Sequence, residues 1–156
     1  MKSTKKDLLT LLALALPPLL LDQLSKAWVR AALPLGQVLA PEAALSQYAR
    51  IVHVRNYGAA GGIFQQYGWV FLVIALLFSV GVVYYFPRVP AEKRLLRWGL
   101  GLLLGGALGN LVDRALFGHV TDFISIGGLP ALNLADLCVL AGVLLLAGGL
   151  WKDDSH

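Results

Sequence analysis

Four aspartates stand inside or beside long apolar stretches of the sequence, where a charged side chain lacks its usual aqueous surroundings. They are Asp22, Asp113, Asp122 and Asp136. The other acidic residues fall in tails or polar connectors, where a solvated charge needs no explanation: Asp7, Glu42, Glu92, Asp153 and Asp154. A carboxylate at the centre of a membrane span costs about 2.5 to 3.5 kcal/mol on insertion scales. The aspartates inside apolar stretches therefore need partners, water or a function.

Paired carboxylates offer one such function, because two of them held close together cannot both ionise easily and one keeps a proton at neutral pH. The charged member can activate a water molecule while the neutral member polarises a carbonyl group. This chemistry needs no metal, histidine or cysteine. The residue types alone leave open which two of the four aspartates form the pair.

Other catalytic groups are weaker candidates. Ser25 next to Lys26 suggests a Ser/Lys dyad, but adjacent residues on a helix do not face each other. The single cysteine, Cys138, provides neither a disulfide framework nor a Cys-based metal site. The histidines lack the i, i+4 spacing of a helical zinc site and are interpreted as solvated loop residues: His53, His119 and His156. We expect no metal and no cofactor.

The elements that must position the aspartates are long and apolar. Of 156 residues, 58% are hydrophobic and 14% are charged, whereas soluble domains carry about 25% charged residues. The apolar residues form four blocks near the length of about 20 residues that a bilayer requires, at 7–32, 69–86, 98–116 and 132–151. The first block follows a lysine-rich start but lacks a small-x-small cleavage site, so it is interpreted as a retained helix. One membrane domain over residues 1–156 is predicted.

Basic residues indicate the orientation of these helices. The net charge is +4, and most of the basic residues lie at block ends, which is typical of membrane topology signals and not of nucleic-acid binding. The residues on one side are Lys2, Lys5, Lys6, Arg88, Lys93, Arg94, Arg97 and Lys152. The opposite loops, about 33–68 and 117–131, hold only Arg50 and Arg55 away from helix ends. Both termini are therefore predicted to be cytoplasmic.

The helical rise predicts that the four aspartates meet near the outer surface. At about 1.5 Å per residue, Asp22 lies about 22 Å along the first helix and Asp113 about 24 Å along the third. Asp136 lies about one turn into the fourth helix, and Asp122 lies just before that helix. Glycines spaced by four lead to Asp113 along the third helix, which predicts a small-residue packing stripe.

The first outer loop contains a strand signal. Residues 48–55 are rich in β-branched side chains and precede an Asn56-Tyr57-Gly58 turn, which predicts a strand or hairpin lying on the membrane. The glycine-rich segment 117–131 is a candidate to pair with it.

Five motifs in this order resemble those of the lipoprotein signal peptidases, the type II signal peptidases of bacterial membranes. The motifs are Leu21-Asp22-Gln23-Leu24-Ser25-Lys26, Asn56-Tyr57-Gly58-Ala59-Ala60, Gly109-Asn110-Leu111-Val112-Asp113-Arg114, Val120-Thr121-Asp122-Phe123 and Leu132-Asn133-Leu134-Ala135-Asp136. They span nearly the whole chain. The resemblance implies an all-α polytopic membrane protein of the bacterial cytoplasmic (inner) membrane, with four transmembrane helices and a small extracytoplasmic β-cradle.

The resemblance also implies an activity and a site. The expected activity cleaves the peptide bond N-terminal to a diacylglyceryl-modified cysteine in a prolipoprotein, with prolipoproteins and membrane lipids as partners and no nucleic acid. The implied catalytic pair is Asp122 and Asp136. Positions that line the substrate pocket or support the pair are Asn56, Asn110, Arg114 and Asn133. The matching positions Asp22 and Asp113 look structural or supporting.

One departure from the family pattern falls in the outer loop, where Gly61-Gly62-Ile63-Phe64 stands in place of the usual early phenylalanine. This displaced aromatic predicts a more flexible loop.

A small ion-coupled transporter or channel is the alternative function, with Asp22, Asp113 and Asp136 as ion ligands. Transporter sites tend to lie near the membrane midplane between inverted repeats, whereas these carboxylates cluster near one face and no repeat is visible. A purely structural bundle is a third interpretation, although it has no need for four carboxylates in one layer. Activity on a lipidated peptide would distinguish the three.

Overall fold

Four long helices follow the four apolar blocks. The computed structural model describes residues 4–39, 48–58 and 63–154. Within these residues the helices are α1 Thr4–Ala32, α2 Gly68–Tyr85, α3 Arg94–Phe117 and α4 Leu134–Asp154. Each is long and apolar enough to cross a membrane. The 3-10 turns η2 (Gln65–Tyr67) and η3 (Phe86–Arg88) flank α2. Gly61 and Gly62, where a flexible loop is predicted, lie outside the described residues.

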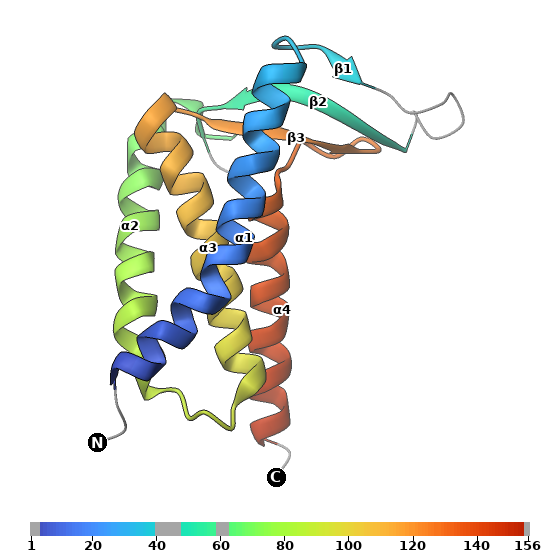
Figure 1. The fold of residues 1–156 in the computed structure, drawn as a ribbon. Coiled ribbons are helices and arrows are strands. Elements are labelled where there is room, and N and C mark those ends of the chain that lie inside the picture. Colours follow the sequence, from blue (N-terminus) through green and yellow to red (C-terminus); the bar gives the residue numbers. More distant parts are fainter. Residues whose placement is uncertain (1–3, 40–47, 59–62, 155–156) are drawn as a thin grey trace.

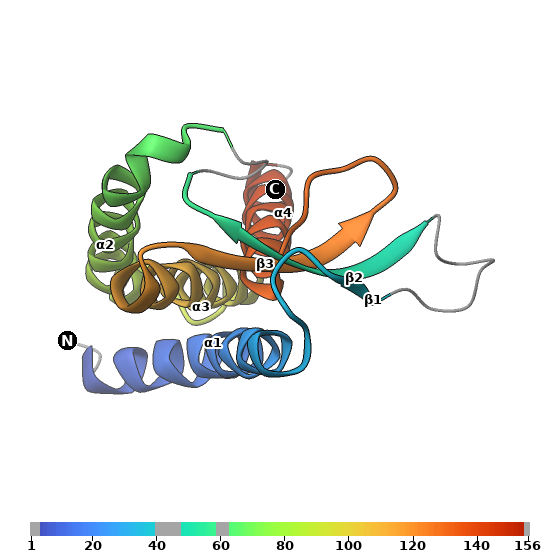
Figure 2. The same cartoon turned by 90° about the horizontal axis from the view of Figure 1, so that it is seen from above.

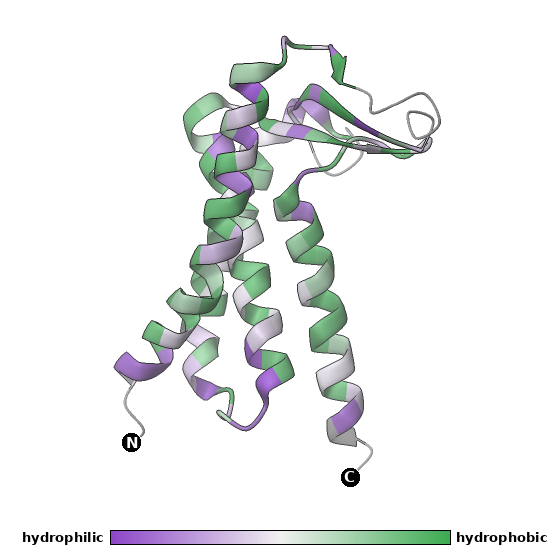
Figure 3. Ribbon diagram, turned by 45° about the vertical axis from the view of Figure 1, so that its right-hand side comes forward, coloured by the Kyte–Doolittle hydropathy of each residue, from purple (hydrophilic) through white to green (hydrophobic). Residues whose placement is uncertain are grey.

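The predicted helix positions differ from the observed ones mainly at polar ends. The third helix begins at Arg94, whereas the apolar block predicts a start at 98. Hydropathy locates the part of a helix that lies in hydrocarbon, but a helix can continue into the polar interface. Figure 3 shows hydrophilic residues at both ends of the bundle, with hydrophobic residues along most of the helices between them.

Helix α3 is the centre of the bundle, since it packs against α1, α2 and α4 (Figure 1). Its glycines allow this close approach. A Cβ atom at Gly105 would lie 2.5 Å from Pro18 Cγ and 2.6 Å from Ala15 O on α1. A Cβ atom at Gly106 would lie 2.5 Å from Ala135 O on α4. The predicted packing stripe therefore lies between helices, where small residues let backbones meet.

A three-stranded antiparallel sheet lies across one end of the bundle (Figures 1 and 2). Its strands are β1 Val38–Leu39, β2 Ala49–Asn56 and β3 Val120–Ile126, in the order β1-β2-β3. The predicted strand at 48–55 thus forms, and it pairs with the glycine-rich segment as expected. The register sets Val54 opposite Asp122 and Asn56 opposite Val120. The fold class of four transmembrane-type helices with a small sheet is confirmed.

Candidate active site

The two aspartates of the expected pair come from different elements. Asp122 lies in the middle of β3 and Asp136 lies in the first turn of α4. Two asparagine side chains connect them. Asn133 Nδ2 donates to Asp122 Oδ1 at 2.7 Å and to Asn110 Oδ1 at 3.1 Å. Asn110 Nδ2 in turn donates to Asp136 Oδ1 at 2.8 Å, so both carboxylates belong to one hydrogen-bond network.

The start of α4 fixes Asp136 locally. Asn133 precedes the helix, and its Oδ1 accepts a hydrogen bond from the Asp136 backbone N–H at 3.0 Å. Asp136 Oδ2 accepts one from the Asn133 backbone N–H at 3.3 Å. This reciprocal arrangement is a capping box, here built from Asn and Asp. The spacing of three residues seen in the sequence therefore both starts the helix and orients a carboxylate.

The end of β2 contributes Asn56, whose Nδ2 donates to Asp122 Oδ2 at 2.9 Å. The Asn56 Oδ1 atom accepts a hydrogen bond from the Gly58 backbone N–H at 2.9 Å. Asparagine commonly bonds the backbone two residues further on in such turns. Because the amide oxygen is engaged with Gly58, the NH₂ group faces Asp122.

Asp122 is 3% exposed. Burial raises the pKa of Asp122 to about 6, since it disfavours the charged form. The hydrogen bond from Asn56 opposes this rise, whereas the charge of Asp136 adds to it. The pKa of Asp122 thus lies above its ordinary value of 3.8, which is the direction that the sequence predicts for one member of a close pair.

Asp22 and Asp113 form a second layer behind the pair, and both are fully buried. Asp22 Oδ1 accepts a hydrogen bond from the Ala135 backbone N–H at 2.9 Å. Asp113 Oδ2 accepts one from the Thr121 backbone N–H at 2.8 Å. Each of these carboxylates therefore holds the residue immediately before one member of the pair.

Lys26 joins this second layer to the first, whereas the sequence suggested it only as a weak partner of Ser25. Its Nζ lies 2.8 Å from Asp22 Oδ2 and 3.5 Å from Asp113 Oδ2, and it donates to Asn110 Oδ1 at 2.9 Å. An ammonium group can only donate, so the Asn110 oxygen must face Lys26 and the NH₂ group must face Asp136. The signal available in the sequence was the i, i+4 spacing of Asp22 and Lys26 on an apolar helix.

Arg114 stabilises the turn that follows β2. Its Nη2 donates to Gly58 O at 2.8 Å, which supports the turn that orients Asn56. Its Nε is buried and has no hydrogen-bond partner within residues 4–39, 48–58 and 63–154. The guanidinium group therefore keeps a donor that a bound peptide could use.

The interpretation of the histidines as solvated was wrong for two of them. His53 is 7% exposed and His119 is 9% exposed. His53 Nδ1 lies 2.7 Å from Leu33 O, and the His119 ring packs on Tyr57. His53 lies within β2 and His119 lies between α3 and β3, and contacts from other parts of the chain, which periodicity could not reveal, bury both. In the described part of the chain, no group of three His, Cys, Asp or Glu residues is arranged to hold a metal ion.

Asp122 also borders a small hollow of about 140 Å³ next to the end of β2. Asn56, Arg55 and Gln65 lie on one side of it, and Pro130 lies on the other. The hollow gives a reactant a place beside a buried carboxyl group.

Comparisons with known proteins identify the family of the chain. Residues 14–152 match the signal peptidase (SPase) II family. A lipoprotein signal peptidase of Moorella thermoacetica is 37% identical over 135 residues, which cover 86% of this chain and 88% of the relative. One of Bacillus subtilis is 40% identical over 129 residues, which cover 80% of this chain and 82% of the relative.

Solved structures give the same result. A bacterial membrane enzyme solved at 2.3 Å resolution superposes with a TM-score of 0.85 at 31% identity, covering 94% of this chain and 90% of its own. A second, solved at 1.9 Å, gives a TM-score of 0.80 at 30% identity, covering 92% and 94%. These matches confirm the resemblance drawn from the five motifs, and the chain belongs to the signal peptidase II family of aspartic proteases.

Proposed function

We propose that this chain is an intramembrane aspartic endopeptidase that removes the signal peptide from prolipoproteins by cleaving N-terminal to a diacylglyceryl-modified cysteine. The observation that carries the proposal is the shared network of Asp122 and Asp136, bridged by Asn133 and Asn110 at the end of an apolar helical bundle. The family and the names of the relatives supply the substrate class.

In this mechanism the pair holds one proton. The ionised carboxylate takes a proton from water, and the resulting hydroxide attacks the scissile carbonyl carbon, while the protonated carboxyl group donates a hydrogen bond to the carbonyl oxygen. The tetrahedral intermediate collapses when the C–N bond breaks and the leaving amine receives a proton from the pair.

The neighbours of the pair have separate roles in this proposal. Asn56 and Asn133 hold Asp122, whereas Asn110 holds Asp136. Arg114 supports the Gly58 turn that orients Asn56. Asp22 and Asp113 act as positioning residues. They accept hydrogen bonds from the backbone N–H groups of Ala135 and Thr121, which precede Asp136 and Asp122.

A comparison of two peptides of the same sequence tests the proposal. Purified protein should cleave the diacylated peptide and leave the unmodified one, because a surface site gains much of its substrate binding from the lipid, at about 0.8 kcal/mol per buried methylene. Asp122→Asn and Asp136→Asn should each abolish turnover, since an amide cannot accept and return the proton. A chelator should have no effect. Equal turnover of both peptides, or full activity in either variant, would refute the proposal.

The proposed location is the bacterial cytoplasmic (inner) membrane, with both termini cytoplasmic and the active site at the outer face. Supporting this, the first residue of α1 and the last residue of α4 lie at one end and the sheet at the other (Figure 1). Basic residues gather at the former end. In a Cys138→Ala background, a cysteine placed by Lys93→Cys should resist an impermeant thiol reagent added to intact cells. Labelling from outside would show that the orientation is the opposite of the proposed one.

The alternative of an ion-coupled transporter has no specific observation in its favour. Membership of a peptidase family supports the hydrolase instead.

A further inference from the structure

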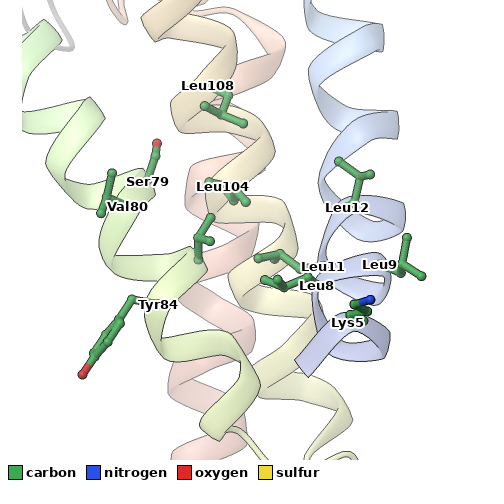
Figure 4. A pocket seen from close by; sticks show the side chains of 11 residues that line it. Lys5, Leu8, Leu9, Leu11, Leu12, Ser79, Val80, Tyr84, Leu104 and Leu108 are labelled. Atoms are coloured by element: carbon green, nitrogen blue, oxygen red, sulfur yellow. The ribbon is translucent and has the colours of Figure 1, made fainter. Parts of the chain in front are cut away.

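An apolar hollow lies between α1 and α2. It is an apolar groove of about 900 Å³ near the start of α1 and the end of α2 (Figure 4). The groove is lined by Leu8 and Leu12 of α1, Val80 and Val83 of α2, and Leu104 and Leu108 of α3. It forms because α1 and α2 each pack on α3 but hardly touch one another. Helix α3 therefore forms the floor of the open groove.

Basic side chains stand at the mouth of this groove. Lys5 is exposed and lines the lower end of the groove on α1. An adjoining hollow of about 470 Å³ shares Leu8, Val83 and Tyr84 with the groove and includes Arg88. The Arg88 guanidinium lies 3.7 Å from the centre of the Tyr84 ring. The apolar groove thus ends in two cationic groups at the level where α1 begins and α2 ends.

The apolar lining alone selects no occupant. Lipid tails are as apolar as leucine, so moving an acyl chain from the bilayer into the groove gains little hydrophobic free energy. Selection must come from the charges at the mouth. The nearest carboxylate on α1, Asp7, is paired with Arg97 at 2.8 Å and so does not neutralise Lys5. The mouth therefore favours an anionic group.

We propose that the groove between α1 and α2 is a binding site for an anionic phospholipid, with one acyl chain in the groove and the phosphate between Lys5 and Arg88. Basic pockets between membrane helices bind such headgroups, and each Lys or Arg near the membrane surface contributes about fivefold in affinity. Arginine also binds phosphate oxygens in pairs through its planar fork. The two cations predict a preference of about 25-fold over a zwitterionic lipid with the same tails.

Other occupants fit this groove less well. A signal peptide carries a positively charged region next to its apolar segment, and a basic mouth would repel that region. A second copy of this chain would bring Lys5 and its basic neighbours to the same place. An anionic phospholipid is the occupant whose charge complements the basic mouth, and one of its two acyl chains fills the groove. This site does not depend on the peptidase reaction.

The test uses the full chain in nanodiscs of equimolar phosphatidylglycerol and phosphatidylcholine with identical acyl chains. Native mass spectrometry after release counts the lipids, peptides or second chains that stay bound. The wild type should retain phosphatidylglycerol in clear excess. The double variant Lys5→Gln, Arg88→Gln should lose that excess, and Val80→Trp should reduce all bound lipid because the indole fills the groove.

The matched control removes two charges from the same end of the bundle. Arg94→Gln with Lys152→Gln alters a separate hollow, so phosphatidylglycerol should be retained as in the wild type. Far-UV circular dichroism confirms that each variant keeps its helices. Three results would overturn the proposal: an unchanged lipid ratio in the Lys5/Arg88 variant, an equal loss in the control, or retention of a signal peptide or second chain that Val80→Trp removes.

Discussion

Replacing Lys26 by methionine should separate stability from catalysis at the buried network. The Lys26 ammonium is 0% exposed and contacts Asp22, Asp113 and Asn110. Breaking a buried ion pair by removal of one partner costs about 3–5 kcal/mol of stability. The substitution also removes one of the two donors that orient the Asn110 oxygen, the other being Asn133, so the hydrogen bond from Asn110 to Asp136 is weakened. A hydrogen bond to a charged group contributes about 1.5–3 kcal/mol, which corresponds to about 10- to 150-fold in rate.

The assay is initial rate on a diacylated peptide, per folded molecule, with kcat and KM measured separately. The decrease in rate should appear in kcat and not in KM, because Asn110 orients the Asp136 carboxylate and adds nothing to the surface that binds the lipid. The matched control is Arg97→Met, which breaks another buried cation pair, 2.8 Å from Asp7 at the opposite end of the bundle. Both variants should unfold more easily, but only the Lys26 variant should lose turnover. An equal loss of kcat in both, or full kcat in the Lys26 variant, would refute the positioning role.

Two further predictions concern the pair and its packing. The pKa of Asp122 rises from 3.8 to about 6. Its protonated form therefore contributes about 3 kcal/mol to the free energy of unfolding below about pH 4, and this contribution is lost as the pH rises through 6. Denaturation from pH 4 to 8 should show that slope in the wild type but not in Asp122→Asn, and turnover should fall on the alkaline side within about one pH unit of 6. Gly109→Ala would place a Cβ 2.5 Å from Asp22 Oδ2. This variant should lose about 1–3 kcal/mol of stability and most of the activity. Gly148→Ala, whose Cβ would have nothing within 4 Å, should be tolerated in both assays.

The helices and the convergence of the aspartates could be predicted because each follows from a local rule. Apolar length located the spans, and the helical rise placed Asp22 and Asp113 at a common depth. The spacing of Asn133 and Asp136 put both on one face, and the structure adds that they cap α4 together. In each case the information lay within one element.

The links between elements could not be predicted in this way. The hydrogen bond that the Ala135 N–H donates to Asp22 joins residues 113 apart in sequence, and Lys26 of α1 donates to Asn110 of α3. No periodicity encodes which helix faces which. The interpretation of His53 as solvated failed for the same reason, since the covering Leu33 lies 20 residues away. The i, i+4 spacing of Asp22 and Lys26 is visible in the sequence. The contact that gives Lys26 its role, with Asn110 of α3, is not.

The two members of the pair are therefore held by different physical means. Asp136 is held by a capping box within four residues at the start of α4 and by one further hydrogen bond, from Asn110 of α3. Asp122 depends on three elements at once, through Asn56 of β2, Asn133 before α4, and Asp113 of α3 acting on Thr121. A displacement of β2 consequently acts on Asp122 and leaves the capping box intact. The sheet is thus coupled directly to Asp122, which lies on β3 and accepts a hydrogen bond from Asn56 of β2.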